Sequence, residues 1–278
     1  MRIRTAGIDI GSRTTKVAVL EDGRLVHSRI VDTGTDPLAR MRELLAETGC
    51  REQDSMGRGI EESRAGHLNP GILESSNPVS VVATGYGRHL ARERLGFPVI
   101  TEIKAHAMGA NRLFPACRTV IDIGGQDSKV IRVEHGRQVN FEMNDRCAAG
   151  TGRFLEVMAM TLGYGVGEFG AEALKASASV AINSMCTVFS ESEVISLIAS
   201  GESKQSIALG LHESIVSRLL ALVGRVGVEP PVVLTGGVAR NPCIRALLER
   251  RLGLPLLVPD EPQIVGALGA ALSAELVT

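Results

Sequence analysis

The chain has 278 residues and a formal net charge of -1, and 44% of its residues are hydrophobic. This composition is typical of a soluble globular protein with room for about two domains. With two tyrosines and no tryptophan, the chain lacks the stacking platforms and the basic field of a nucleic-acid binder, so we expect no nucleic-acid partner. We find no apolar run of the roughly 20 residues that span a bilayer, and the five cysteines fit a reducing compartment. The sequence therefore predicts a cytoplasmic protein with no membrane partner.

Strand and helix patterns alternate along the chain, which predicts an α/β fold with layered sheets. Residues 8–26 have the pattern of a strand, a glycine turn and two further strands, and residues 121–139 repeat it. Residues 50–78 are rich in Gly, Ser, Glu, Asn and Pro, so we expect a surface insertion there. Further strands are expected at 79–83 and 232–235, and helices at 37–48, 88–95, 103–113, 152–162, 191–199, 203–224, 241–251 and 265–276.

The clearest internal signal is a repeat at an offset of 113 residues. Residues 8–26 read IDIGSRTTKVAVLEDGRLV and residues 121–139 read IDIGGQDSKVIRVEHGRQV, and ten of these 19 positions are identical. The D-G and H-G pairs lie where a hairpin turn would join the second strand to the third. The sequence therefore predicts a duplicated β-meander.

The first meander contains the parts of a phosphate-binding turn. A glycine just past a strand lets backbone N–H groups approach phosphate oxygens without a side chain in the way. The hydroxyl groups of Ser12, Thr14 and Thr15 would add donors, and Lys16 would add a positive charge. The second meander has the same glycine turn.

Asp9 and Asp122 occupy corresponding positions near the ends of the two first strands. Carboxylates placed there could hold a hydrated Mg²⁺ ion through its waters. An ordinary glycine hairpin with a capping aspartate explains either copy alone, because single motif matches are often false. The duplication favours the phosphate-binding interpretation.

A third stretch, LTGGVARN at 234–241, puts Gly236 and Gly237 where a nucleoside could lie against bare backbone. By itself TGG is equally typical of a structural turn. In this order and spacing, the three stretches resemble the phosphate 1, phosphate 2 and adenosine motifs of the actin, hexokinase, acetate kinase and Hsp70 superfamily. The resemblance implies two ribonuclease-H-like domains that close on ATP, one formed by residues 1–115 with the C-terminal helix 264–278 and one by residues 116–263.

The superfamily resemblance also implies roles for single residues. Asp9 and Asp122 would serve the Mg²⁺ ion, with Asp122 also catalytic. Gln126 would orient the attacking water, by analogy with glutamines in other NTPases. The residues expected to bind the nucleotide are Ser12, Arg13, Thr14, Thr15, Lys16, Gly124, Gly125, Gly236, Gly237 and Gln263.

Cys147 and Cys186 each precede a predicted helix, and Ser190 with Glu193 has capping-box spacing. Thiolates near helix N-termini gain from the helix dipole, so both cysteines are suited to be metal ligands. A [4Fe–4S] cluster needs about four thiolates, and a two-fold dimer would supply the other two. The alternative is that both are buried apolar residues, which is what we expect of Cys50, Cys117 and Cys243.

Six stretches resemble the activators of 2-hydroxyacyl-CoA dehydratases, a family that belongs with the ATPase subunits of benzoyl-CoA reductase. The resemblance implies an oxygen-sensitive homodimer in which Cys147 and Cys186 of each subunit bind one [4Fe–4S] cluster. ATP hydrolysis would drive one electron, received from a ferredoxin or flavodoxin, to an iron–sulfur acyl-CoA dehydratase or reductase component. The stretches are TGYGR at 84–88, EIKAHAMGA at 102–110, IDIGGQDSKVI at 121–131, NFEMNDRCAAGTGRFLEVMA at 140–159, CTVFSESEVISL at 186–197 and TGGVARN at 235–241.

The sequence departs from that family in two places. The insertion around 57–77 is longer than expected, and Ala105 stands where we expect another cysteine. Other functions on the same fold are a small-molecule kinase and an ATP-gated assembly protein, since fold does not fix function. We find no signature for a kinase acceptor, and neither alternative explains two cysteines at helix starts.

Overall fold

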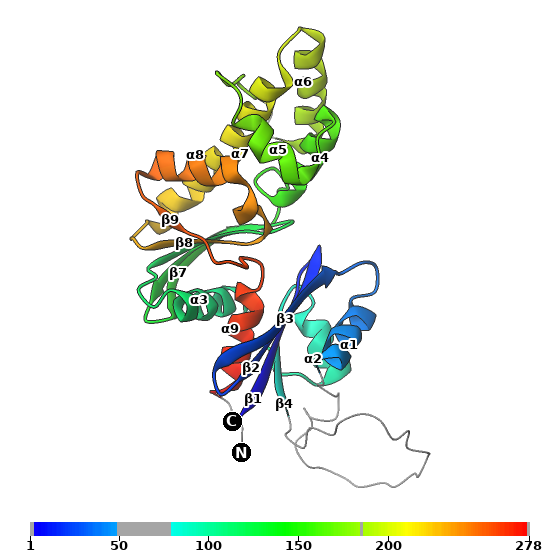
Figure 1. Cartoon of the computed structure of the whole chain (residues 1–278), viewed down its shortest axis with the longest axis vertical. Helices are drawn as coiled ribbons and strands as arrows, with labels where there is room; N and C mark the ends of the chain where they lie inside the picture. The colour runs from blue at the N-terminus through cyan, green and yellow to red at the C-terminus, as the bar shows by residue number, and fades with distance from the viewer. Residues whose placement is uncertain (1–2, 49–78, 184–185, 277–278) are drawn as a thin grey trace. The chain divides into compact units, whose positions relative to one another are not determined.

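The computed structural model describes residues 3–48, 79–183 and 186–276, so the expected insertion at 50–78, with Cys50, lies outside the described residues. The chain divides into two compact units (Figure 1). Unit 1 comprises Met1–Gly109 and Gly266–Thr278, and unit 2 comprises Ala110–Val265. The C-terminal helix, red in Figure 1, therefore returns to the unit in which the chain begins.

Unit 1 is built on a four-stranded sheet of order β3-β2-β1-β4, in which β1 pairs antiparallel with β2 and parallel with β4. Alternate residues of β2 enter different cores: Val17 and Val19 pack with α1 and α2, whereas Ala18 packs with α9. A Cβ at Gly7 would lie 2.0 Å from the carbonyl oxygen of Ala267, so only glycine lets α9 approach β1 this closely. The elements are β1 (Arg4–Ile10), β2 (Thr14–Glu21), β3 (Arg24–Asp32), α1 (Pro37–Glu47), β4 (Val79–Gly85), α2 (Arg88–Leu95), α3 (Glu102–Leu113) and α9 (Val265–Ala274).

Unit 2 is built on a five-stranded sheet of order β7-β6-β5-β8-β9, with β5 antiparallel to β6 and parallel to β8. Its core joins strand residues such as Ile121 to helix residues such as Phe154, Phe169 and Ile215. The elements are β5 (Thr119–Ile123), β6 (Ser128–Glu134), β7 (Arg137–Asn144), α4 (Gly152–Leu162), α5 (Val166–Ala173), α6 (Thr187–Ala199), α7 (Lys204–Val226), β8 (Val232–Thr235), the 3₁₀ helix η2 (Gly237–Arg240), α8 (Pro242–Leu252) and β9 (Leu256–Leu257).

The duplicated β-meander is confirmed, and its two copies share small details. Asp22 and Gly23 have φ values of 48° and 73°, and His135 and Gly136 have 49° and 76°, as type I′ hairpin turns require. Each copy also has a register shift between its second and third strands, one at Val19/Leu20 and the other at Arg132/Val133. These positions are separated by the same offset as the sequence repeat, so the duplication extends to backbone geometry.

The predicted strands and helices are present, but the expected start of α6 is wrong. The helix begins at Thr187 rather than at 191, with Cys186 as its N-cap in extended conformation and no side-chain capping bond. The Ser190 N–H donates to the Cys186 carbonyl at 2.8 Å, so Ser190 lies inside the first turn and does not cap the helix. The run Thr187–Phe189 hid this start, because β-branched and aromatic residues favour strand patterns. The sequence analysis also missed α5 and β9.

Among the described residues, α7 alone is long and apolar enough to span a bilayer. In its most apolar window, 56% is buried within the fold. Its buried residues, from Ile207 to Val226, belong to the core of unit 2. This burial is typical of the central helix of a globular domain.

Candidate functional site

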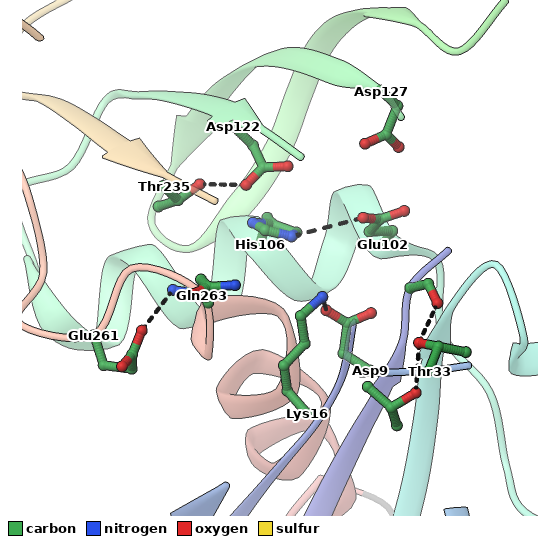
Figure 2. A network of polar contacts seen from close by, with 12 residues as sticks. Asp9, Lys16, Thr33, Glu102, His106, Asp122, Asp127, Thr235, Glu261 and Gln263 are labelled. Carbon is green, nitrogen blue, oxygen red and sulfur yellow. Dashed lines mark hydrogen bonds and ion pairs between the residues drawn. The ribbon is translucent and has the colours of Figure 1, made fainter. Parts of the chain in front are cut away.

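Asp9 lies near the end of β1, directly opposite Lys16 in the antiparallel register (Figure 2). The Lys16 Nζ atom is 3.1 Å from Asp9 Oδ2. Asp9 Oδ1 is buried and has no hydrogen-bond partner among the described residues. A Cβ at Gly85 would lie 2.4 Å from this oxygen, so the bare glycine keeps the space beside it open. An orphaned carboxylate oxygen of this kind can accept a bond from a metal-bound water.

The hydroxyl groups of the first hairpin have different surroundings. Thr15 is buried, and its Oγ1 lies 3.0 Å from Thr33 Oγ1, which donates to the carbonyl of Gly11 at 2.8 Å (Figure 2). Ser12 and Arg13 are exposed and Thr14 is half-buried at the turn. The Thr15 hydroxyl is thus engaged within unit 1, whereas the side chains of Ser12 and Arg13 are accessible to a ligand.

Asp122 holds the corresponding position in unit 2 and has more partners than Asp9. Its Oδ2 is 3.1 Å from Lys129 Nζ, and its Oδ1 accepts a hydrogen bond from Thr235 Oγ1 at 2.7 Å (Figure 2). Lys129 is fully buried and is also 2.9 Å from Asp127 Oδ2. Sequence reasoning missed Asp127, because the repeat aligns it with Thr14, which carries no charge. The lysine of the second hairpin therefore pairs with one more carboxylate than the lysine of the first.

The turn of the second hairpin is joined to α4. The Gly124 N–H donates to the Asp127 carbonyl at 2.9 Å, which matches the bond from Gly11 to Thr14 in the first hairpin. The carbonyls of Gly124 and Gly125 accept the N–H groups of Gly152 and Arg153, both at 2.8 Å. These two donors begin α4, so the turn and the start of the helix are held together. The Gln126 side chain at the tip of the turn is exposed.

Gly236, Gly237 and Gln263 lie close together at the end of β8. Gly236 has a φ of 84°, and a Cβ there would lie 2.3 Å from the Ile123 carbonyl oxygen, so only glycine fits. A Cβ at Gly237 would be 3.5 Å from Gln263 Nε2, which places the glutamine amide beside the bare backbone.

The pair Thr235–Gly236 has a counterpart in unit 1 that was not identified from the sequence. Thr84 is registered with Asp9 on parallel strands, as Thr235 is with Asp122. Each threonine is followed by a glycine with positive φ, Gly85 or Gly236. The duplication therefore includes the end of this strand. A search for repeats at the fixed offset of 113 residues does not detect it, because that offset does not relate Thr84 to Thr235.

Cys147 and Cys186 are exposed and line one cavity of about 480 Å³ in unit 2. The alternative that both are buried apolar residues is therefore wrong. Cys117 and Cys243 are buried as expected, and burial raises the pKa of the first thiol to about 11 and of the second to about 12. Burial thus disfavours the thiolate form of both, and neither lines the cavity of Cys147 and Cys186.

The side chain of Asn144 holds the loop that carries Cys147. Asn144 accepts a hydrogen bond from the Cys147 N–H at 3.2 Å and donates its Nδ2 to the Cys147 carbonyl at 2.8 Å. Asn144, Arg218 and Arg225 also line the cavity. Asn144 lies in the stretch 140–159 that also contains Cys147, but no role was assigned to it from the sequence. Arg218 and Arg225 were missed because they come from α7, distant in the chain from both cysteine stretches.

Two units built on duplicated β-meanders with glycine turns define an α/β protein of the actin, hexokinase, acetate kinase and Hsp70 superfamily, with two ribonuclease-H-like domains. The chain belongs to the BadF/BadG/BcrA/BcrD ATPase family, whose model matches residues 6–274.

Three proteins illustrate this relationship. The (R)-2-hydroxyglutaryl-CoA dehydratase activating ATPase of Acidaminococcus fermentans is 42% identical over 99% of this chain and 98% of its own. The solved activator of the 2-hydroxyisocaproyl-CoA dehydratase from Clostridium difficile, with bound ADPNP, is 40% identical with a TM-score of 0.79, covering 98% of this chain and 94% of that one. One of the benzoyl-CoA reductase subunits of Thauera aromatica is 33% identical over 96% of this chain and 92% of its own.

Proposed function

We propose that this chain is an ATP-hydrolysing one-electron donor that activates a 2-hydroxyacyl-CoA dehydratase. Its active form would be a homodimer in which one [4Fe–4S] cluster is bound by Cys147 and Cys186 of both copies. The observation that carries this proposal is that the two exposed cysteines share one cavity in the unit that also contains the second phosphate hairpin. The dehydratase activators among its relatives favour this activity.

The cysteine cavity fits half of a cluster site. Two thiols are accessible, which is half of the four that a [4Fe–4S] cluster takes. Cys186 is the N-cap of α6, so the positive end of the helix dipole favours a thiolate there. When bound, the cluster would supply a low-potential site for one electron. Asn144 would hold the Cys147 loop in place through its two hydrogen bonds.

The surface beside the cavity supports a second copy as the source of the missing thiolates. Val188, Phe189, Ile195 and Ile198 on α6 are all exposed apolar side chains. Four exposed large apolar side chains on one helix, whose N-cap is Cys186, are typical of a protein interface. A two-fold axis through this region would bring four cysteines together.

The two hairpins would bind the nucleotide. Asp9, with its orphaned oxygen, and Asp122 would hold the waters of Mg²⁺. Gln126, exposed at the turn, would orient the attacking water. The phosphates would lie against Ser12, Arg13, Thr14, Thr15, Lys16, Gly124 and Gly125, and the adenosine against Gly236, Gly237 and Gln263.

We further propose that residues 1–115 with 264–278 and residues 116–263 act as the two closing domains. The electron would come from a ferredoxin or flavodoxin in the cytoplasm and pass to an iron–sulfur acyl-CoA dehydratase component. A specific alternative is the ATPase subunit of a benzoyl-CoA reductase, which the similarity to the Thauera aromatica protein favours. Activation of either purified acceptor enzyme distinguishes the two.

Iron analysis of anaerobically purified protein tests the proposal. The wild type should carry about four irons per dimer, and Cys147→Ser and Cys186→Ser should lose them. Cys117→Ser and Cys243→Ser are matched controls and should retain iron, because their thiols are buried. Full iron in the Cys147 variant contradicts the bridging arrangement.

A further inference from the structure

The cysteine cavity contains two arginines that the proposed function does not use. Arg218 and Arg225 both come from α7. Arg225 Nε is 3.3 Å from Glu142 Oε2, and both side chains are largely exposed, so its charge is compensated and screened by water. Arg218 is half-buried; burial lowers the pKa of its guanidinium group, and the interaction with Cys147 partly offsets that effect.

The position of Arg218 is fixed from several sides. Its Nη1 atom lies 3.4 Å from the Ser214 carbonyl oxygen and 3.3 Å from the Ser214 hydroxyl. Its guanidinium carbon is 6.0 Å from the ring centroid of Phe154, a fully buried residue of α4. The backbone of Gly150 lies beside its aliphatic part, since a Cβ at Gly150 would be in ordinary van der Waals contact with Arg218 Cδ at 3.7 Å. The cation is therefore held at the cavity wall.

We propose that Arg218 is a positioning residue for the redox centre. The fixed positive charge of Arg218 favours the reduced state of the group that Cys147 and Cys186 bind. The inference rests on the proposed function. Accepting one electron adds one negative charge to the cluster, and a cation partly removed from water stabilises that charge more than an exposed one does. A two-fold dimer would place one Arg218 on each side of the cluster. Arg218 thus raises the reduction potential and makes the cluster easier to load.

The first test is an anaerobic redox titration with a low-potential one-electron reductant, followed by the electron paramagnetic resonance signal of the reduced cluster. Arg218→Met removes the charge and keeps the length of the side chain. The reduction midpoint should therefore become more negative by at least about 59 mV, which corresponds to a tenfold change in the one-electron equilibrium constant. Arg218→Lys keeps the charge and should stay near the wild type. Arg225→Met is the matched control from the same cavity and should shift less, because Glu142 already compensates that charge.

Iron analysis of the same preparations separates this inference from the proposed function. If the wild type holds no iron, the proposed function fails. If Arg218→Met holds as much iron as the wild type and the two reduction midpoints are equal, the inference about Arg218 fails. A lysine variant whose midpoint matches that of the methionine variant also overturns the inference.

Discussion

Lys129 and Lys16 occupy the same position in the two hairpins but have different environments. Lys129 is fully buried between Asp122 and Asp127, whereas the Lys16 side chain is 14% exposed and pairs with Asp9. Removing one partner of a buried ion pair costs roughly 3 to 5 kcal/mol, because the remaining charge is left uncompensated. The two lysines therefore contribute differently to stability.

We predict that Lys129→Met destabilises the protein more than Lys16→Met does. The first change leaves two buried carboxylates, Asp122 and Asp127, without a cation, and the second leaves only one, Asp9. Urea unfolding of the iron-free protein, with the transition of each unit followed separately, measures the difference. Equal urea midpoints for the two variants would show that burial of the lysine does not determine its contribution to stability.

His212 has a defined protonation state. Its Nδ1 is 2.7 Å from the Ala208 carbonyl oxygen and therefore carries the proton, so Nε2 accepts from Asn241 Nδ2 at 3.0 Å. The Asn241 Oδ1 atom is then available to accept the N–H groups of Cys243 and Ile244 at the start of α8. Burial lowers the pKa of His212 from 6.5 to about 4.

From this lowered pKa we predict that His212 makes stability fall as pH falls. Above pH 6.5 the ring is neutral in both the folded and the unfolded state, and its full contribution is present. Between pH 6.5 and about 4 the unfolded state binds the proton first, so a contribution of about 3 kcal/mol is lost. His212→Gln removes the titration, and the difference in unfolding free energy between wild type and variant should shrink over this range. A constant difference contradicts the assignment.

At the scale of elements, two helices of unit 2 connect the nucleotide motifs with the cysteine cavity. The helix α4 begins on the carbonyls of Gly124 and Gly125 and follows the Cys147 loop. The helix α7 contacts Asn241 through His212 and carries Arg218 to the cavity. Packed helices transmit small shifts along their length, so both can report a change at the motifs to the cysteines.

The exposed apolar face of α6 leads to a prediction about assembly. Ile195 is 57% exposed and lies about two and a half turns beyond Cys186, too far along the helix to alter the thiol itself. We predict that Ile195→Glu produces a monomer that holds no iron, because a charge in an apolar interface is costly to desolvate. Leu174→Glu, on an apolar residue that is 48% exposed outside α6, is the control and should remain dimeric. Anaerobic sedimentation with iron analysis measures both, and a dimeric, iron-loaded Ile195 variant would exclude this face.

Local signals explain which elements were predictable from the sequence. The meanders were visible because D-G and H-G turns and strand alternation are encoded within a few residues. The start of α6 was not, because Cys186 caps it through backbone geometry alone. Asp127 lies only two residues from its partner Lys129 and was missed because the repeat aligns it with the uncharged Thr14. Arg218 was missed because it contacts Phe154, which is distant in the chain, and a single sequence does not encode such contacts locally.

At the scale of the whole molecule, nucleotide binding must be coupled to the redox centre if the chain is an electron donor. The glycines of the second hairpin and of the TGG stretch lie in unit 2, as does the cysteine cavity, and α4 and α7 connect them. A ligand shifts an equilibrium only by its differential affinity for two states, so ADP and a non-hydrolysable ATP analogue should differ in effect.

We therefore predict that the ATP analogue speeds removal of cluster iron by a chelator and shifts the reduction midpoint, relative to ADP and to nucleotide-free protein. Movement of α4 and α7 would change the solvent access and the electric field at the cluster. The chelation rate and the reduction midpoint are measured under anaerobic conditions in the three states. The Asn241→Ala variant breaks the contact to His212 and should weaken the effect of the ATP analogue on both. A small-molecule kinase with an incidental metal site gives three identical results and a stable phosphorylated product, whereas a nucleotide-gated donor gives different rates and releases only inorganic phosphate from ATP.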